Sequence, residues 1–141
     1  MAMPQDGKVI YTAKVHTTGG RENGAAHSTD GNLDVKLGVP GTHRPGTNPE
    51  QLFAAGWSAC FESAIKLAAQ KKKIALPQDV TIDAEVDLHS GPSGYYLSAR
   101  FNVAVPGVDR AAAQGLIQDA EGLCPYSKVT RGNIDVTFTL V

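Results

Sequence analysis

Cysteine is scarce in this chain of 141 residues, which contains only Cys60 and Cys124. Neither cysteine belongs to a C-x-x-C pair, and no H-x-x-x-H spacing is present. Zinc sites are built from such spacings, so no metal site is expected. A Walker loop, a dinucleotide fingerprint and a G-x-S-x-G elbow are also missing, and we expect no bound cofactor. The four histidines are scattered along the chain: His16, His27, His43 and His89.

Charge and hydrophobic runs exclude several further classes of protein. The formal net charge is −1, which gives no electrostatic reason to expect a nucleic-acid partner or an acidic membrane surface. The first residues form no apolar core of a secretory signal, and no apolar run approaches the ~20 residues of a membrane span. We therefore expect a cytoplasmic protein. In a reducing compartment a cysteine pair is more often catalytic or redox-sensing than structural.

The first third of the chain predicts a three-stranded antiparallel meander. Residues 9–15 and 33–37 alternate apolar and polar side chains, and a short strand is expected over residues 25–28. Glycine-rich turns separate these segments. A loop over residues 38–48 then contains three glycines and two prolines, and it is long enough to be functional.

The rest of the chain predicts two main helices and three strands. Asn48, Pro49 and Glu50 are typical of a helix start, and the helix is expected to continue to about Lys72. A second helix should begin after Asp109 and end near Cys124, because Pro125 disfavours helical geometry in its predecessor. Strands are expected over residues 80–88, 95–105 and 134–140. The prediction is a single α+β domain over residues 1–141, with helices packed on antiparallel sheet.

Cys60 lies on a distinctive stripe of the first long helix. At about 100° per residue, Glu50, Phe53, Trp57 and Cys60 fall within an arc of about 80°. The stripe thus combines a carboxylate, two aromatic rings and a thiol. The alternative is that Cys60 has only a structural role as a small core residue, since free cysteine is often buried.

A nucleophilic role for Cys60 requires a cation. Burial in apolar surroundings raises the pKa of a thiol, and the reactive species is the thiolate. Glu50 is a natural partner for an activating arginine, although a glutamate at a helix start can also serve only the helix dipole. The residues alone do not choose among the arginines: Arg21, Arg44, Arg100, Arg110 and Arg131.

Cys124 is expected at the end of the second helix, where the negative end of the dipole disfavours a thiolate. Such a thiol stays protonated while Cys60 reacts, which suits a resolving residue in a segment able to move. Alternatively, Cys124 is a buried helix cap. The step from Cys124 to Ser127 is predicted to be a bend.

Several segments resemble the organic hydroperoxide resistance proteins, a branch of the Ohr/OsmC superfamily. The two specific cysteine motifs lie in residues 47–61 (TNPEQLFAAGWSACF) and residues 124–136 (CPYSKVTRGNIDV). Residues 11–13, 19–21 (GGR) and 33–37 (LDVKL) match as well, so the resemblance covers nearly the whole chain.

This resemblance implies an OsmC-like fold, an intertwined homodimer with two sites at its interface, and a thiol peroxidase for alkyl and fatty-acid hydroperoxides. Cys60 matches the peroxidatic cysteine and Cys124 the resolving one, while Arg21 and Glu50 match the pair that activates the thiolate. The implied reductant is a dihydrolipoyl group, free or carried on a protein. Phe53, Trp57 and Tyr126 are the expected apolar lining for the substrate.

The chain departs from the family pattern in ways that bear on substrate preference. The loop over residues 38–46 is short and charged, Trp57 stands where tyrosine is common, and Lys128 and Val129 replace a more usual Asn-Ala. Three rival readings stay open: a non-catalytic redox sensor or hydrophobic-ligand binder, a peroxidase of the OsmC branch with broader specificity, and a disulfide-stapled structural domain.

Overall fold

A computed structural model describes residues 6–141, and its chain divides into two compact units at Pro49. The N-terminal unit holds a three-stranded antiparallel sheet in the order β1-β2-β3. Its strands are β1 (Val15–Thr18), β2 (Ala25–Ser28) and β3 (Asp34–Lys36), and a four-residue helix, α1 (Gly20–Asn23), joins the first two. The predicted meander is confirmed.

The first strand begins later than the alternation of residues 9–15 predicts. Val15 pairs with Ser28, and the Thr29 N–H donates to the Lys14 carbonyl at 3.0 Å. There β2 gives way to a turn, so the ladder does not continue over residues 9–13. Val9 and Ile10 are 82% and 89% exposed. A β pattern without a neighbouring strand does not form a ladder, which is why the prediction for this segment is wrong.

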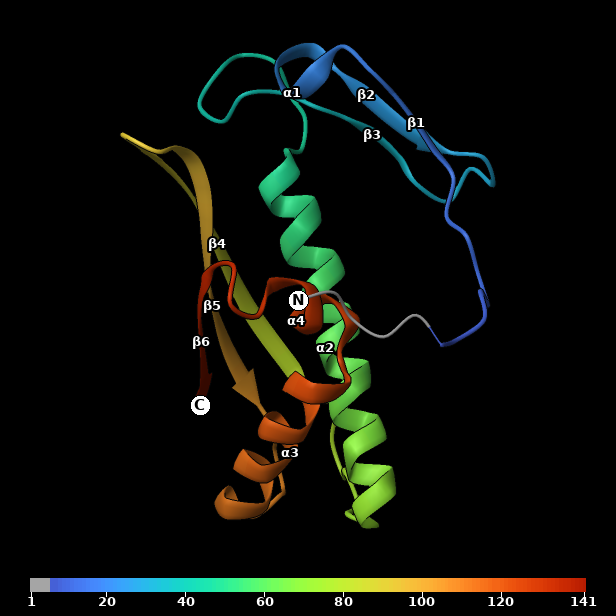
Figure 1. The fold of residues 1–141 in the computed structure, drawn as a ribbon, viewed down its shortest axis with the longest axis vertical. Helices are drawn as coiled ribbons and strands as arrows, with labels where there is room; N and C mark the ends of the chain where they lie inside the picture. Colours follow the sequence, from blue (N-terminus) through green and yellow to red (C-terminus); the bar gives the residue numbers. More distant parts are fainter. Residues whose placement is uncertain (1–5) are drawn as a thin grey trace. The chain divides into compact units, whose positions relative to one another are not determined.

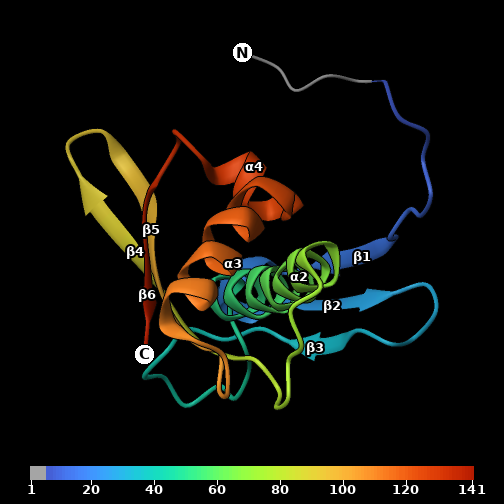
Figure 2. The ribbon, with the colours of Figure 1, turned by 90° about the horizontal axis from the view of Figure 1, so that it is seen from below.

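The C-terminal unit places two helices against a second three-stranded sheet. These elements are α2 (Pro49–Lys72), β4 (Thr81–Gly91), β5 (Gly94–Ala104), α3 (Arg110–Leu123), α4 (Pro125–Thr130) and β6 (Asp135–Leu140). Figures 1 and 2 show α2 and α3 on one face of the sheet β4-β5-β6. The α+β class and both main helices are confirmed, and α2 has the predicted bounds.

The closing strand corrects the expectation of purely antiparallel sheets. β4 and β5 form an antiparallel hairpin, whereas β6 pairs with β5 in parallel, with Ser98 opposite Asp135. Parallel neighbours need a crossover connection, and α3 with α4 supplies it. The crossover brings the chain back across the helical face of the sheet, and Cys124 lies within it.

Aromatic rings fill the core between α2 and the sheet. Trp57 and Phe61 of α2 are fully buried, and so is Phe101 of β5. The Trp57 and Phe101 ring centroids are 4.6 Å apart, and Phe61 stacks on Phe138 at the same separation with an interplanar angle of 15°. Offset and tilted aromatic pairs add to the free energy of burial, so this stretch of α2 is held firmly against the sheet.

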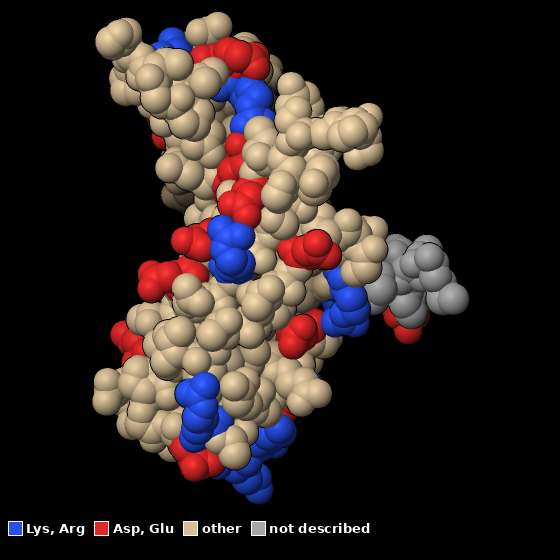
Figure 3. Space-filling view, turned by 90° about the vertical axis from the view of Figure 1, so that its left-hand side faces the viewer, with Lys and Arg blue, Asp and Glu red and all other residues tan. Residues whose placement is uncertain are grey.

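The opposite face of this sheet is charged. Figure 3 shows acidic and basic side chains gathered on it, and Arg100 of β5 lies opposite Glu85 of β4. Arg100 binds Glu85 at 2.8 Å (Nε to Oε1) and also both carboxylate oxygens of Asp87. The hydrogen bonds from Arg100 lower the pKa of Asp87 to about 2. The sheet therefore has one apolar face covered by helices and one solvated face.

Candidate functional site

Cys60 lies in the middle of α2 and is partly exposed at the edge of the core. Small residues surround it in the sequence, among them Gly56 and Ala64, and they allow another element to approach the helix closely. The element that does so is α4. A Cβ atom built on Gly56 would lie 2.8 Å from the hydroxyl oxygen of Tyr126, so a larger residue here would displace this ring.

Cys124 joins two helices. It is extended (φ −73°, ψ 122°), ends α3 and begins α4, with Pro125 at the first position of the new helix. Its backbone N–H donates to Ala120 at 2.9 Å, and its carbonyl accepts from Lys128 at 3.0 Å. The predicted bend after Cys124 is thus a short helix, and proline after a capping residue is the sequence signal that would have identified it.

The two cysteines differ in burial. Cys124 is completely buried, whereas Cys60 is partly accessible. A small molecule arriving from solvent therefore meets Cys60 first. Whether Cys124 moves during a reaction stays a prediction, but its backbone is bonded to a helix on each side in this structure.

The thiols of Cys60 and Cys124 contact each other, and this contact adds to the effect of burial on the pKa of Cys60. Burial raises the pKa of the Cys60 thiol, and the hydrogen bond and charge interaction with Cys124 raise it further. The backbone N–H of Tyr126 acts in the opposite direction, since it donates a hydrogen bond to the Cys60 sulfur. Within the C-terminal unit, Cys60 is therefore a protonated thiol that needs an added cation to become a strong nucleophile.

An apolar cavity of about 250 Å³ opens beside α4. Phe53 of α2 and Tyr126 of α4 form part of its wall, with ring centroids 6.1 Å apart. Both were expected as substrate-contacting residues, and the structure brings them together. The sequence did not predict the other lining residues, because a bend was expected where the structure has the helix α4. These residues are Pro125, Val129 and Thr130.

Trp57, the third residue of the expected apolar lining, lies behind that wall. Its side chain is fully buried, and its ring centroid is 5.3 Å from that of Phe53. The indole Nε1–H donates a hydrogen bond of 3.1 Å to the Ser127 hydroxyl, which is also buried. Direct contact of Trp57 with a substrate stays a prediction. Its visible role is to support Phe53 and to bond α2 to α4.

Glu50 and Arg21 belong to different units of the chain. Glu50 is in the first turn of α2, and Arg21 is in α1, which follows two glycines with positive φ angles (Gly19 at 77°, Gly20 at 69°). Their predicted action on Cys60 stays a prediction.

The other arginines have partners within their own units. Arg44 donates to the carbonyls of Leu37 (2.9 Å) and Asn23 (3.0 Å). Arg131, the rival that the glycine-rich context also favoured, donates to the Glu121 carbonyl at 2.5 Å. Arg110 donates to the Leu140 carbonyl, and Arg100 is held by two carboxylates. These contacts describe the other four arginines only, and the role of Arg21 stays what the resemblance implies.

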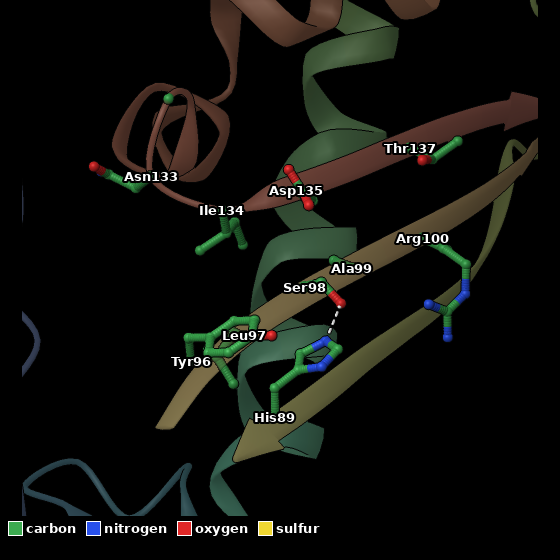
Figure 4. Close-up of a pocket in the computed structure, with 11 residues that line it drawn as sticks. His89, Tyr96, Leu97, Ser98, Ala99, Arg100, Asn133, Ile134, Asp135 and Thr137 are labelled. Carbon is green, nitrogen blue, oxygen red and sulfur yellow. Dashed lines mark hydrogen bonds between the residues drawn. The ribbon is translucent and has the colours of Figure 1, made fainter. Parts of the chain in front are cut away.

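A larger hollow of about 510 Å³ lies on the charged face of the sheet (Figure 4). There the Ser98 hydroxyl is 2.8 Å from His89 Nε2, a spacing that suggests a serine nucleophile. However, Ser98 donates its single hydrogen to Asp87 at 3.1 Å, so His89 must be the donor to Ser98. A histidine that donates to a serine does not act as its base, and the cysteine site is the better chemical candidate.

Within residues 6–141, no group of three or more histidine, cysteine or carboxylate side chains could hold a metal ion. None of the helices described is both long and apolar enough to cross a membrane.

The family model for OsmC-like proteins matches residues 40–139 of this chain. The organic hydroperoxide resistance protein of Xanthomonas axonopodis pv. citri is 50% identical and covers 99% of both chains. OhrA of Bacillus subtilis, which bears the same family name, is 41% identical over 91% of this chain and 94% of its own.

Solved structures agree with these sequence relatives. The crystal structure of OhrB from Bacillus subtilis superposes with a TM-score of 0.88 at 40% identity, covering 94% of this chain and all of its own. An organic hydroperoxide resistance protein from Legionella pneumophila gives the same TM-score at 41% identity, covering 94% of this chain and 98% of its own.

The thiol–thiol contact predicts how Cys124 influences its partner. Cys124→Ala removes the hydrogen bond and the charge interaction that raise the pKa of Cys60, so that pKa should fall. The rate of alkylation of Cys60 measured against pH, with mass-spectrometric detection, gives the result. Ser63→Ala, at an exposed position of α2, is the matched control. A Cys60 profile unchanged by loss of Cys124 would show that the two thiols do not interact in solution.

Proposed function

This chain belongs to the OsmC-like family, with organic hydroperoxide resistance proteins among its relatives, and we propose that it is a thiol peroxidase for organic hydroperoxides. The observation that carries the proposal is the contact between an accessible thiol and a buried one beside an apolar cavity. The family supports a role in organic hydroperoxide detoxification. The steps and residue roles below are our inference.

The first step is attack by the Cys60 thiolate on one peroxide oxygen. The O–O bond breaks, the alkoxide takes a proton and leaves as an alcohol, and Cys60 becomes a sulfenic acid. Arg21, paired with Glu50, supplies the positive charge that favours the thiolate over the raised pKa set by burial. Phe53 and Tyr126 contact the alkyl chain, with Trp57 supporting Phe53 from the core.

The second step closes a disulfide. The sulfur of Cys124 attacks the sulfenic acid, a water molecule leaves, and the Cys60–Cys124 bond forms. Two thiol–disulfide exchanges with a dihydrolipoyl dithiol then return both thiols and oxidise the lipoyl group to its cyclic disulfide. Because Cys60 is the accessible member of the pair, the external dithiol attacks there first.

A preference for alkyl hydroperoxides over hydrogen peroxide follows from the cavity. Each methylene group that leaves water for an apolar wall contributes about 0.8 kcal/mol. Hydrogen peroxide has no such group. The charged loop over residues 38–46 remains a second candidate for influencing this preference.

A homodimer gives the site its full set of residues in this proposal. Glu50 and Cys60 are ten residues apart on α2, which is about 15 Å along a helix axis. One guanidinium bridging both groups on the same chain would have to span most of that length. The interface site implied by the resemblance solves this problem, because Glu50 of one copy then lies near Cys60 of the other. In addition, the sheet of the N-terminal unit buries few apolar side chains, Ala26 and Leu37 among them.

Turnover with defined reductants separates this proposal from its rivals. We expect steady consumption of cumene hydroperoxide with dihydrolipoamide, and little with thioredoxin or glutathione. Cys60→Ser should reduce turnover to background, whereas Cys124→Ser should consume about one peroxide per subunit and then stall. Stoichiometric oxidation without turnover in the unmodified protein would instead indicate a redox sensor. Equal rates with hydrogen peroxide would indicate the broader specificity of the OsmC branch.

Mixed dimers test the shared site. Cys60→Ser and Glu50→Ala should each be inactive when expressed alone. When the two variants are coexpressed, a mixed dimer contains one site with both Cys60 and Glu50 intact, so part of the activity should return. Activity that stays at the level of the two separate variants would place both residues of one site on the same chain.

A further inference from the structure

The buried hydrogen bond between Trp57 and Ser127 joins two elements that each carry half of the thiol site. Trp57 is one helical turn before Cys60 on α2, and Ser127 directly follows Tyr126 in the first turn of α4. The indole Nε1–H to Ser127 hydroxyl distance is 3.1 Å across 70 residues of sequence. Both residues are buried, and a hydrogen bond shielded from water is strong and costly to leave unmade.

Three neighbouring contacts join the first turn of α4 to one stretch of α2. Tyr126 covers Gly56, Ser127 bonds Trp57, and the Tyr126 backbone N–H bonds the sulfur of Cys60. This N–H belongs to the first turn of a helix, where no backbone carbonyl of the same helix is available to it. Its aim at Cys60 therefore depends on how firmly the first turn of α4 is held against α2.

Other hydrogen bonds around α4 stiffen it without joining it to α2. The Thr130 hydroxyl donates to the carbonyl of Tyr126 at 2.9 Å, and the Arg131 N–H donates to Ser127 at 3.0 Å. These bonds keep α4 intact as a unit. The bond from Trp57, by contrast, joins a side chain of α2 directly to a side chain of α4.

We propose that Trp57 and Ser127 are positioning residues of the peroxidase reaction, and that their hydrogen bond holds the first turn of α4 so that the Tyr126 N–H stays on the Cys60 sulfur and Cys124 stays in contact with it. The inference rests on the proposed function for its purpose. Neither residue touches the reacting atoms, and the effect reaches them through the backbone of α4.

The test uses variants of the full chain in a Cys124→Ser background, so that Cys60 is the only thiol. Ser127→Ala and Trp57→Phe remove the two halves of the bond. Each should raise the pKa of Cys60, because a hydrogen bond to the thiolate is weakened, and should slow alkylation at neutral pH about ten-fold. Ultraviolet absorbance of the thiolate against pH provides an independent readout of the same change.

A double-mutant cycle distinguishes positioning from general damage. If the pair acts through its hydrogen bond, the double variant should lose no more thiolate than either single variant. Ser127→Thr, which keeps the hydroxyl, should stay close to the parent. Ser58→Ala is the matched control, because the Ser58 hydroxyl donates only within α2, to Ala54 at 2.7 Å and Ala55 at 3.3 Å.

Unchanged Cys60 profiles in folded Ser127→Ala protein, or additive effects in the cycle, would overturn the proposal. Ser127→Ala removes a single oxygen atom, so it decides the matter even if Trp57→Phe fails to fold. Restoring Cys124 gives a second measurement, in which Ser127→Ala should slow disulfide formation after one equivalent of peroxide. Thiol titration needs no turnover. If the unmodified protein shows no peroxidase activity but Ser127→Ala still raises the pKa of Cys60, the result would count against the proposed function and not against the positioning role.

Discussion

The contact between the Cys60 and Cys124 thiols is the interaction on which the proposed chemistry of this molecule depends. It brings together residues 64 positions apart in sequence, one in the middle of α2 and one between α3 and α4. The parallel pairing of β6 with β5 explains how the second residue arrives there, since that pairing requires a crossover over the helical face of the sheet. The core of Trp57, Phe61 and Phe101 then fixes α2 beneath it.

Burial of the thiol pair has one favourable and one unfavourable consequence for the proposed reaction. Packing of α4 against α2 keeps the two thiols in contact, but the accompanying burial raises the pKa of Cys60. The chain offsets this in part with the Tyr126 N–H, which costs no charge. The remainder calls for a cation, and in our proposal Arg21 provides it. In that proposal a weakly acidic thiol is activated by a paired arginine and glutamate, which is why the site would require several segments of the chain.

Much of the architecture could be predicted from local sequence signals. Proline and glutamate after Asn48, and lysines at the far end, determined the bounds of α2, and Asp109 does cap α3 through the Ala112 N–H. Two kinds of feature could not be predicted. The partner of a strand is a non-local property, so residues 9–15 and the parallel direction of β6 were misread. The helix after Cys124 is only six residues long, and it begins at a proline. A proline is equally typical of a bend, so the sequence alone predicts a bend there.

The most direct test of the account is the mass of the protein after one equivalent of alkyl hydroperoxide with no reductant present. The account predicts loss of two hydrogen atoms, with peptide mapping that locates one bond between Cys60 and Cys124 and recovery of both thiols on addition of dihydrolipoamide. An oxidised product that instead carries added oxygen on Cys60 while Cys124 remains a free thiol would contradict the central claim that these two cysteines act as one redox pair.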